Sequence, residues 1–224
     1  GICNTALGRT SMELNTTGSC NTAVGKDALS NNTSANHNTA IGFQSLLANT
    51  TGTQNVSTGT CSLRGNTTGS NSAAFGFCAL ASGTTANLNT AIGNFALKTT
   101  DNGCKNTAVG YQSMFDATSA ECNVALGAYS LANNTTADFN TALGTCSMLT
   151  NTTGANNVAV GYNSLFSNTT GAINTAVGAG ALKSNTTGTS NVAVGCDALD
   201  SNTTGNENTI VGREAGCSNT TGNC

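Results

Sequence analysis

A 17-residue unit recurs thirteen times, without insertion or deletion, between Cys3 and Asn223. Its consensus is x-Asn-Thr-Ala-Val-Gly-x-x-Ala/Ser-Leu-x-x-Asn-Thr-Thr-Gly-x, with positions numbered 1 to 17. The units start at residues 3, 20, 37, 54, 71, 88, 105, 122, 139, 156, 173, 190 and 207. Such a constant register is typical of solenoids, in which every coil rests on the coil before it. The sequence therefore predicts thirteen stacked coils.

No linker interrupts the repeat, so we expect residues 1–224 to form a single continuous array. Only 8% of the residues are charged and proline is absent. The fixed register of the apolar positions argues against disorder, which is typical of chains rich in Pro and Glu. Gly1 and Ile2 fit the last two positions of a preceding unit, and we expect the chain to be a piece of a longer product.

Two positions occupied by small residues divide each unit into two short segments. Position 6 is always Gly, which predicts a backbone conformation closed to other residues or a close approach between coils. Position 16 is always Gly or Ala and predicts a second corner. The segments Asn-Thr-Ala-Val and Ala/Ser-Leu-x-x each fit a strand of about four residues. The expected fold is all-β, a parallel β-solenoid (β-roll) with two short strands per coil.

The first segment has apolar residues on both faces, because neighbouring strand residues point in opposite directions. Position 5 is bulky, as in Ile41 and Phe75, and position 4 is nearly always Ala. We expect the bulky residues to pack inside the coil against the Leu residues of position 10. The Ala face would then be buried against another chain. The alternative is a coil so thin that both columns of residues line its interior.

Position 2 is Asn in twelve units, with Ser72 as the exception. Stacked coils place equivalent residues about 4.8 Å apart. At this spacing a column of Asn side chains can bond from coil to coil. We predict an amide ladder with a structural role.

The unit resembles the head repeats of trimeric autotransporter adhesins, which form a left-handed parallel β-roll. The resemblance rests on the Asn-Thr-Ala-Val-Gly and Ala-Leu segments and covers essentially the whole chain. Gly110-Tyr111-Gln112-Ser113-Met114 is also similar to repeats in fibre proteins of phages, large viruses and microbial eukaryotes. The resemblance implies a β-roll, and it implies a spacer, an adhesin or a fibre shaft as function. The Asn-Thr-Thr-Gly turn makes this unit longer than the adhesin repeat.

Ten units carry an N-glycosylation sequon at position 13. The predicted sites are Asn15, Asn32, Asn49, Asn66, Asn134, Asn151, Asn168, Asn185, Asn202 and Asn219. Asn31, Asn55 and Asn133 begin sequons outside this column. A chain with few charges gains solubility from sugars on an outer turn. The alternative is that Asn-Thr-Thr-Gly is retained as turn chemistry alone.

Ten cysteines occupy few positions of the unit. Cys3 and Cys20 share position 1 in adjacent coils, and Cys61 and Cys78 share position 8. Stacked neighbours lie within the range of roughly 4.4–6.8 Å between Cα atoms that a disulfide spans. The further candidate pairs are Cys104 with Cys122 and Cys196 with Cys217, and the candidates for bonds to another chain are Cys146 and Cys224. This pattern favours an oxidising, extracellular location.

The residues of catalysis and metal binding are scarce. His37 is the only histidine, no Cys-x-x-Cys pair exists, and the Gly columns lack the Lys of a phosphate loop. The acids Asp197, Asp200, Glu207 and Glu214 gather in the last two units without a repeated partner. We expect no enzyme activity, no cofactor and no metal site.

The expected function is structural, as the subunit of an extracellular glycosylated fibre, filament or coat stapled by disulfides. The expected partners are copies of the chain itself and covalent glycans. The net charge of −3 disfavours nucleic acid, and no apolar run reaches the roughly 18 residues of a membrane span. An adhesin or receptor-binding fibre is the first alternative, and the aromatic residues at position 7 would suit carbohydrate. An ice-binding solenoid is the second, because positions 14 and 15 form Thr columns.

Overall fold

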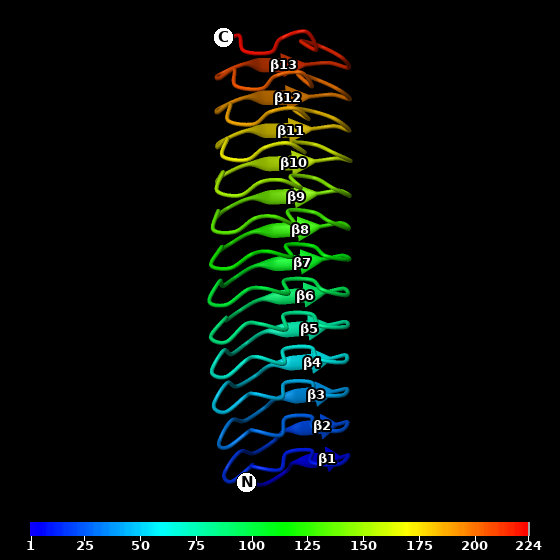
Figure 1. Ribbon diagram of the computed structural model, residues 1–224, viewed down its shortest axis with the longest axis vertical. Coiled ribbons are helices and arrows are strands. Elements are labelled where there is room, and N and C mark those ends of the chain that lie inside the picture. Colours follow the sequence, from blue (N-terminus) through cyan, green and yellow to red (C-terminus); the bar gives the residue numbers. More distant parts are fainter. Residues whose placement is uncertain (224) are drawn as a thin grey trace. The chain divides into compact units, whose positions relative to one another are not determined.

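The computed structural model describes residues 1–223 and contains two compact units. The first comprises Gly1–Val109 and Ala117–Ser119, and the second Gly110–Asp116 and Ala120–Cys224. Within each unit parallel strands stack coil upon coil, and the described residues contain no helix (Figure 1). The predicted all-β parallel β-solenoid with 17-residue coils is confirmed. A single array through all thirteen coils stays a prediction.

Each coil contributes one strand of three residues, at positions 3 to 5. The first unit contains β1 (Thr5–Leu7), β2 (Thr22–Val24), β3 (Thr39–Ile41), β4 (Val56–Thr58), β5 (Ala73–Phe75), β6 (Thr90–Ile92) and β7 (Thr107–Val109). The second contains β8 (Val124–Leu126), β9 (Thr141–Leu143), β10 (Val158–Val160), β11 (Thr175–Val177), β12 (Val192–Val194) and β13 (Thr209–Val211). Within each unit every strand pairs in parallel with the next, and paired residues are one coil apart in the sequence.

The second predicted strand is wrong, because positions 7 to 12 form turns in every coil except coil 5, where the turn covers positions 7 to 10. The backbone still bonds between coils there, as when Leu46 N donates to Ser62 O over 2.9 Å. The segment curves because positions 8 and 10 are left-handed, with φ of 54° at Gln44 and 53° at Leu46. A left-handed residue with a Cβ costs roughly 1–2 kcal/mol. Nothing in the residue types Gln and Leu signals this conformation.

The Gly found at position 6 of every unit has both predicted features, a backbone conformation unfavourable for other residues and a close approach between coils. Gly42 has a φ of 132°, outside the range that L-residues adopt readily. A Cβ added to Gly42 would also lie 2.6 Å from the carbonyl oxygen of Gly59 in the next coil. The backbone therefore turns sharply where adjacent coils approach most closely.

The two faces of the strand are reversed relative to the prediction. Ala40 and Ala74 of position 4 are fully buried, whereas Ile41 and Phe75 of position 5 are 41% and 40% exposed. The interior is narrow, and the Leu column of position 10 fills it so closely that the facing strand has room only for a methyl group. The predicted inward bulky column and the alternative in which both columns line the interior are both wrong.

The last coil reveals which columns face each other. Ile210 replaces the Ala of position 4, and Gly216 replaces the Leu of position 10. A Cβ added to Gly216 would lie 3.3 Å from Ile210 Cγ1 and 3.3 Å from Leu199 Cδ1. The side chain of Ile210 therefore fills the space that Leu occupies in the other coils, and the core volume is retained by an exchange of positions.

Replacing Ile210→Ala is expected to loosen the last coil by about 2 kcal/mol, because a cavity opens beside Gly216. The double variant Ile210→Ala/Gly216→Leu restores the arrangement of the other coils and is expected to recover the loss. Hydrogen exchange of the amides of residues 207–220 measures both effects. Additive losses in the double variant would contradict the facing of positions 4 and 10.

Candidate functional site

The asparagines of position 2, here called the first amide column, form the predicted ladder. The backbone N–H of Asn191 donates to Asn174 Oδ1 in the preceding coil over 3.0 Å. Asn191 Nδ2 donates across its own coil to Gly205 O over 2.8 Å. These side chains are buried, so each amide satisfies both its neighbour and the turn opposite.

The sequon asparagines of position 13, here called the second amide column, also face inward. Asn168 Nδ2 donates to Asn151 Oδ1 over 2.8 Å and to Gly171 O over 2.9 Å. Asn32, Asn49, Asn66, Asn134, Asn151, Asn168, Asn185 and Asn202 are at most 1% exposed, and Asn15 and Asn219 are half-buried. The expected outward, sugar-bearing column is therefore a second internal ladder.

The second amide column has a direction. Within a run, Nδ2 donates to the Oδ1 of the preceding coil, as from Asn32 to Asn15 and from Asn202 to Asn185, so an Oδ1 that no later Asn reaches has no donor. Asn66 Oδ1 and Asn202 Oδ1 are buried without a hydrogen-bond partner. Asn219 follows Asn202 in the column, but its Nδ2 donates to Asn208 Oδ1 over 3.4 Å. Asn66 precedes Gly83, which has no side chain to donate.

Attachment of a glycan at the buried Asn residues is incompatible with this geometry. The glycan would replace one hydrogen of Nδ2, and both hydrogens are engaged inside the coil, as at Asn168. Among the sequons outside the column, Asn55 is buried, whereas Asn31 and Asn133 are exposed. The second amide column carried its own signal in the sequence, because its Asn recurs while positions 11 and 12 beside it vary.

The structure holds all nine described cysteines as thiols, so it forms none of the predicted disulfides among them. Cys104 belongs to the first unit and Cys122 to the second. Cys196 is exposed, and its Sγ donates to Asp197 Oδ2 over 3.3 Å. This hydrogen bond raises the pKa of the Cys196 thiol. Cys146 is half-buried, and Cys224 lies outside the described residues.

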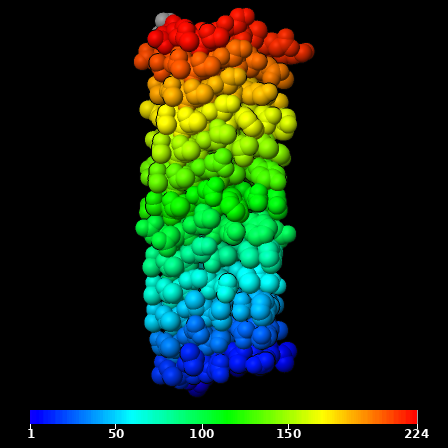
Figure 2. All heavy atoms as spheres, viewed as in Figure 1, coloured from blue at the N-terminus to red at the C-terminus, as the bar shows by residue number. Residues whose placement is uncertain are grey.

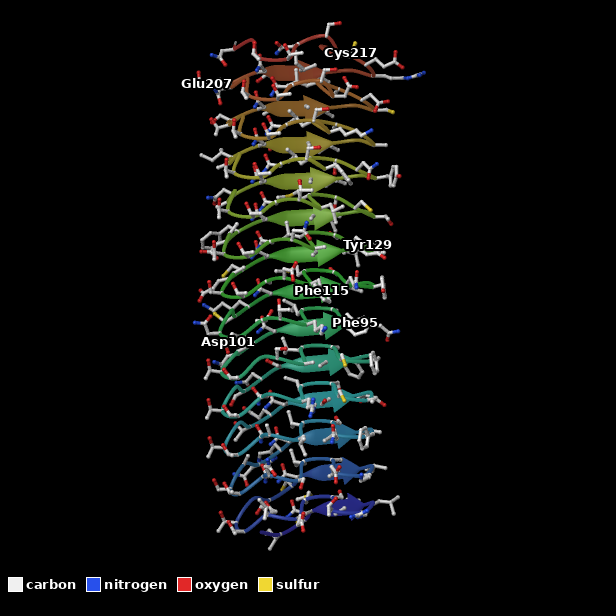
Figure 3. All side chains as sticks on the ribbon, in the orientation of Figure 1. Phe95, Asp101, Phe115, Tyr129, Glu207 and Cys217 are labelled. Atoms are coloured by element: carbon white, nitrogen blue, oxygen red, sulfur yellow. The ribbon has the colours of Figure 1, made fainter. Side chains whose placement is uncertain are left out.

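Aromatic rings project outward at positions 7 and 8, directly after the strand, as Phe95 and Tyr129 show in Figure 3. In the first unit the rings of Phe77 and Phe95 meet edge to face, with centroids 5.1 Å apart. In the second unit Tyr111 and Tyr129 meet in the same way at 5.3 Å. Because these rings contact one another and stay partly exposed, they form external ridges rather than core.

One hollow interrupts these ridges in the second unit. Its volume is about 240 Å³, and its lining includes Tyr162, Gly180, Lys183 and Asp197. It arises because Ala179 and Gly180 leave positions 7 and 8 of their coil almost empty. The face shown in Figure 2 has no deep cleft in either unit.

The two Thr columns of the proposed ice-binding face have different surroundings. At position 14, Thr50 Oγ1 donates to Thr67 O in the next coil over 3.0 Å. At position 15, Thr51 and Thr68 are exposed to solvent. The hydroxyls of position 14 therefore bond within the stack, whereas the side chains of position 15 face solvent.

Residues 1–223 contain no group of three or more His, Cys, Asp or Glu side chains placed to hold a metal. In the same residues no helix has the length and apolarity to cross a membrane. His37 is exposed, as expected, and so are Glu207 and Glu214. Glu214 pairs with Arg213 over 2.7 Å. Asp197 and Asp200 are half-buried.

Comparisons of the chain with models of protein families, with curated proteins and with solved structures find no match.

Replacing Asn168→Asp is expected to destabilise the second unit by about 3 kcal/mol, because a buried carboxylate then faces the oxygens of Asn151 and Gly171. Thermal denaturation monitored by circular dichroism measures the loss. Asn31→Asp makes the same chemical change at an exposed position and serves as the control. Equal stability of the two variants would contradict the second ladder.

Secretion from a eukaryotic cell is expected to leave the eight buried sequons of the second amide column without sugar, because a glycan there blocks folding. Glycans are expected at Asn31 and Asn133, whose side chains reach solvent. Glycopeptide mapping of the secreted, folded protein checks this distribution, with Asn31→Gln/Asn133→Gln as the control. A glycan on Asn168 of the folded protein would overturn the prediction.

Proposed function

We propose that the chain is a structural subunit of an extracellular fibre, filament or coat, in which copies pack side by side. The observation that carries the proposal is the outer sheet face, formed by the side chains of positions 3 and 5. No charged residue occurs at either position in any of the thirteen units. This face is nonetheless exposed, with 37% exposure at Val56, 41% at Ile92 and 48% at Leu126.

An exposed, uncharged sheet face favours association, and its position 5 is apolar in nearly every coil. A second copy is the partner that fits it best, because its side chains repeat with the same coil spacing and can interdigitate along a whole unit. An unrelated surface lacks this period. The sequence had predicted that the Ala residues of position 4 would contact the partner. Because they are buried, the contact face is formed by positions 3 and 5 instead.

The interior supports a structural role. The amide ladders and the backbone bonds between coils satisfy polar groups from coil to coil, which leaves proteases few open backbone segments. Leu, Ala and Asn side chains make up most of the buried interior. A molecule built in this way resists unfolding outside the cell, which supports the extracellular location.

Ile41→Lys/Ile92→Lys is expected to abolish association, because the facing copies would bury unpaired charges. Sedimentation equilibrium should give a multiple of 22.2 kDa for the unchanged protein and a monomer for the variant. Thr51→Lys/Thr85→Lys adds the same charge at exposed position 15 and is expected to associate normally.

Unchanged association of the Ile variant would contradict the proposed face. A monomer at every concentration would favour the second candidate function, a fibre that binds a receptor or carbohydrate. The observation that favours this candidate is the exposed aromatic ridge of positions 7 and 8, with 60% exposure at Tyr162.

A further inference from the structure

Coil 5, residues 71–87, is the one coil that lacks both column asparagines. Ser72 stands in the first amide column, and Gly83 in the second. Ser72 keeps part of the ladder, because its N–H donates to Asn55 Oδ1 over 3.0 Å and its Oγ accepts from Asn89 N over 3.2 Å. It has no amide to donate across the coil, as Asn55 does to Gly69 O over 2.8 Å.

The loss at Gly83 leaves buried polar atoms without partners on both sides of coil 5. Asn66 Oδ1 in coil 4 has no donor, and Thr100 Oγ1 in coil 6 has no partner. Both residues are at most 1% exposed. A buried acceptor without a donor costs roughly 1–3 kcal/mol. The junction of coils 4 and 5 is therefore held by fewer side-chain hydrogen bonds than the junctions with complete ladders.

Two thiols meet at the same junction. Cys61 of coil 4 and Cys78 of coil 5 share position 8, and the backbone continues its bonds between coils there, from Cys78 N to Thr60 O over 2.9 Å. Both cysteines are half-buried. Burial, and then the hydrogen bond and charge of the Cys61 thiol, raise the pKa of the Cys78 thiol. Because the two cysteines hold the same position in adjacent coils, their Cα atoms are expected to lie about 4.8 Å apart, within the range of a disulfide.

We propose that Cys61 and Cys78 form a reversible disulfide that joins coil 4 to coil 5 in place of the amide bonds that coil 5 lacks. The bond closes a loop of one coil and restricts the opening of this junction. It acts within one chain, so it does not depend on the proposed lateral association.

The chemistry requires a small-molecule disulfide, such as oxidised glutathione, as oxidant. The Cys61 thiolate attacks one sulfur of the oxidant, forms a mixed disulfide and expels the first small thiolate. The Cys78 thiolate then attacks Cys61 Sγ and expels the second. The two protons lost by the cysteines go to the two released thiols. Two protein thiols are thus oxidised, and one small disulfide is reduced to two thiols.

Peptide mapping tests the bond directly, because trypsin cleaves after Lys26, Arg64 and Lys98. Each of the peptides 27–64 and 65–98 contains one cysteine, Cys61 or Cys78. After treatment of the folded protein with oxidised glutathione, blocking of the remaining thiols and denaturation, we expect a linked pair of these peptides. Dithiothreitol should separate it, and Cys78→Ser should prevent it. Absence of the linked pair from the oxidised protein would overturn the proposal.

Hydrogen exchange tests whether the disulfide compensates for the amide hydrogen bonds that coil 5 lacks. Oxidation is expected to slow the opening of coil 5 on the order of a hundredfold. Gly83→Asn supplies the missing donor to Asn66 Oδ1, so coil 5 of the reduced variant should be better protected and should gain less from oxidation. The Cys3→Ser/Cys20→Ser background removes the other stacked pair and should leave the gain unchanged. An equal gain in Gly83→Asn and in the unchanged chain would overturn the compensating role.

Discussion

The hydrogen bond from one coil to the next is the interaction on which this structure depends. It recurs in the backbone, as from Leu46 N to Ser62 O, and in both amide columns. Burying an Asn is unfavourable unless its donors and acceptor are all used. The repeat satisfies the donors and acceptors of the buried Asn side chains in most coils, because each amide meets an identical amide at a fixed spacing. Where a coil departs from the pattern, as at Gly83, a buried atom loses its partner.

The corners depend on a second constraint, which is strain. Three positions of each coil are left-handed, and nearly all hold residues with a Cβ, such as His37, Gln44 and Leu46. Each costs free energy that an extended segment would not. The cost is offset where the turn aims a Leu into the core and leaves the backbone N–H in line with the next coil. The Leu column can fill the interior only because the chain bends around it.

Four features could be predicted from the sequence because each follows from the repeat alone. They are the 17-residue period, the parallel stacking, the Gly corner at position 6 and the first amide column. Which face of the strand points into the core could not be predicted. Ala and Val are both apolar, and only the packing of the interior decides which of them is buried. The exchange of Ile210 and Gly216 did carry the answer, since two positions that change size together share one space. The sequons misled for a different reason. Asn-Thr-Thr specifies recognition by a modifying enzyme, whereas the burial of Asn168 follows from the ladder.

The exact coil period also governs how such a chain can change in length. Inserting or deleting one residue would move every later Asn out of its column and turn every later Leu away from the core. Inserting or deleting a whole coil would preserve each donor, each acceptor and each core contact, because the new neighbours are chemically equivalent. Gene segments that encode one coil can therefore be gained or lost by unequal recombination without a new folding problem. A lineage could adjust the reach of this molecule in steps of one coil, about 4.8 Å at a time.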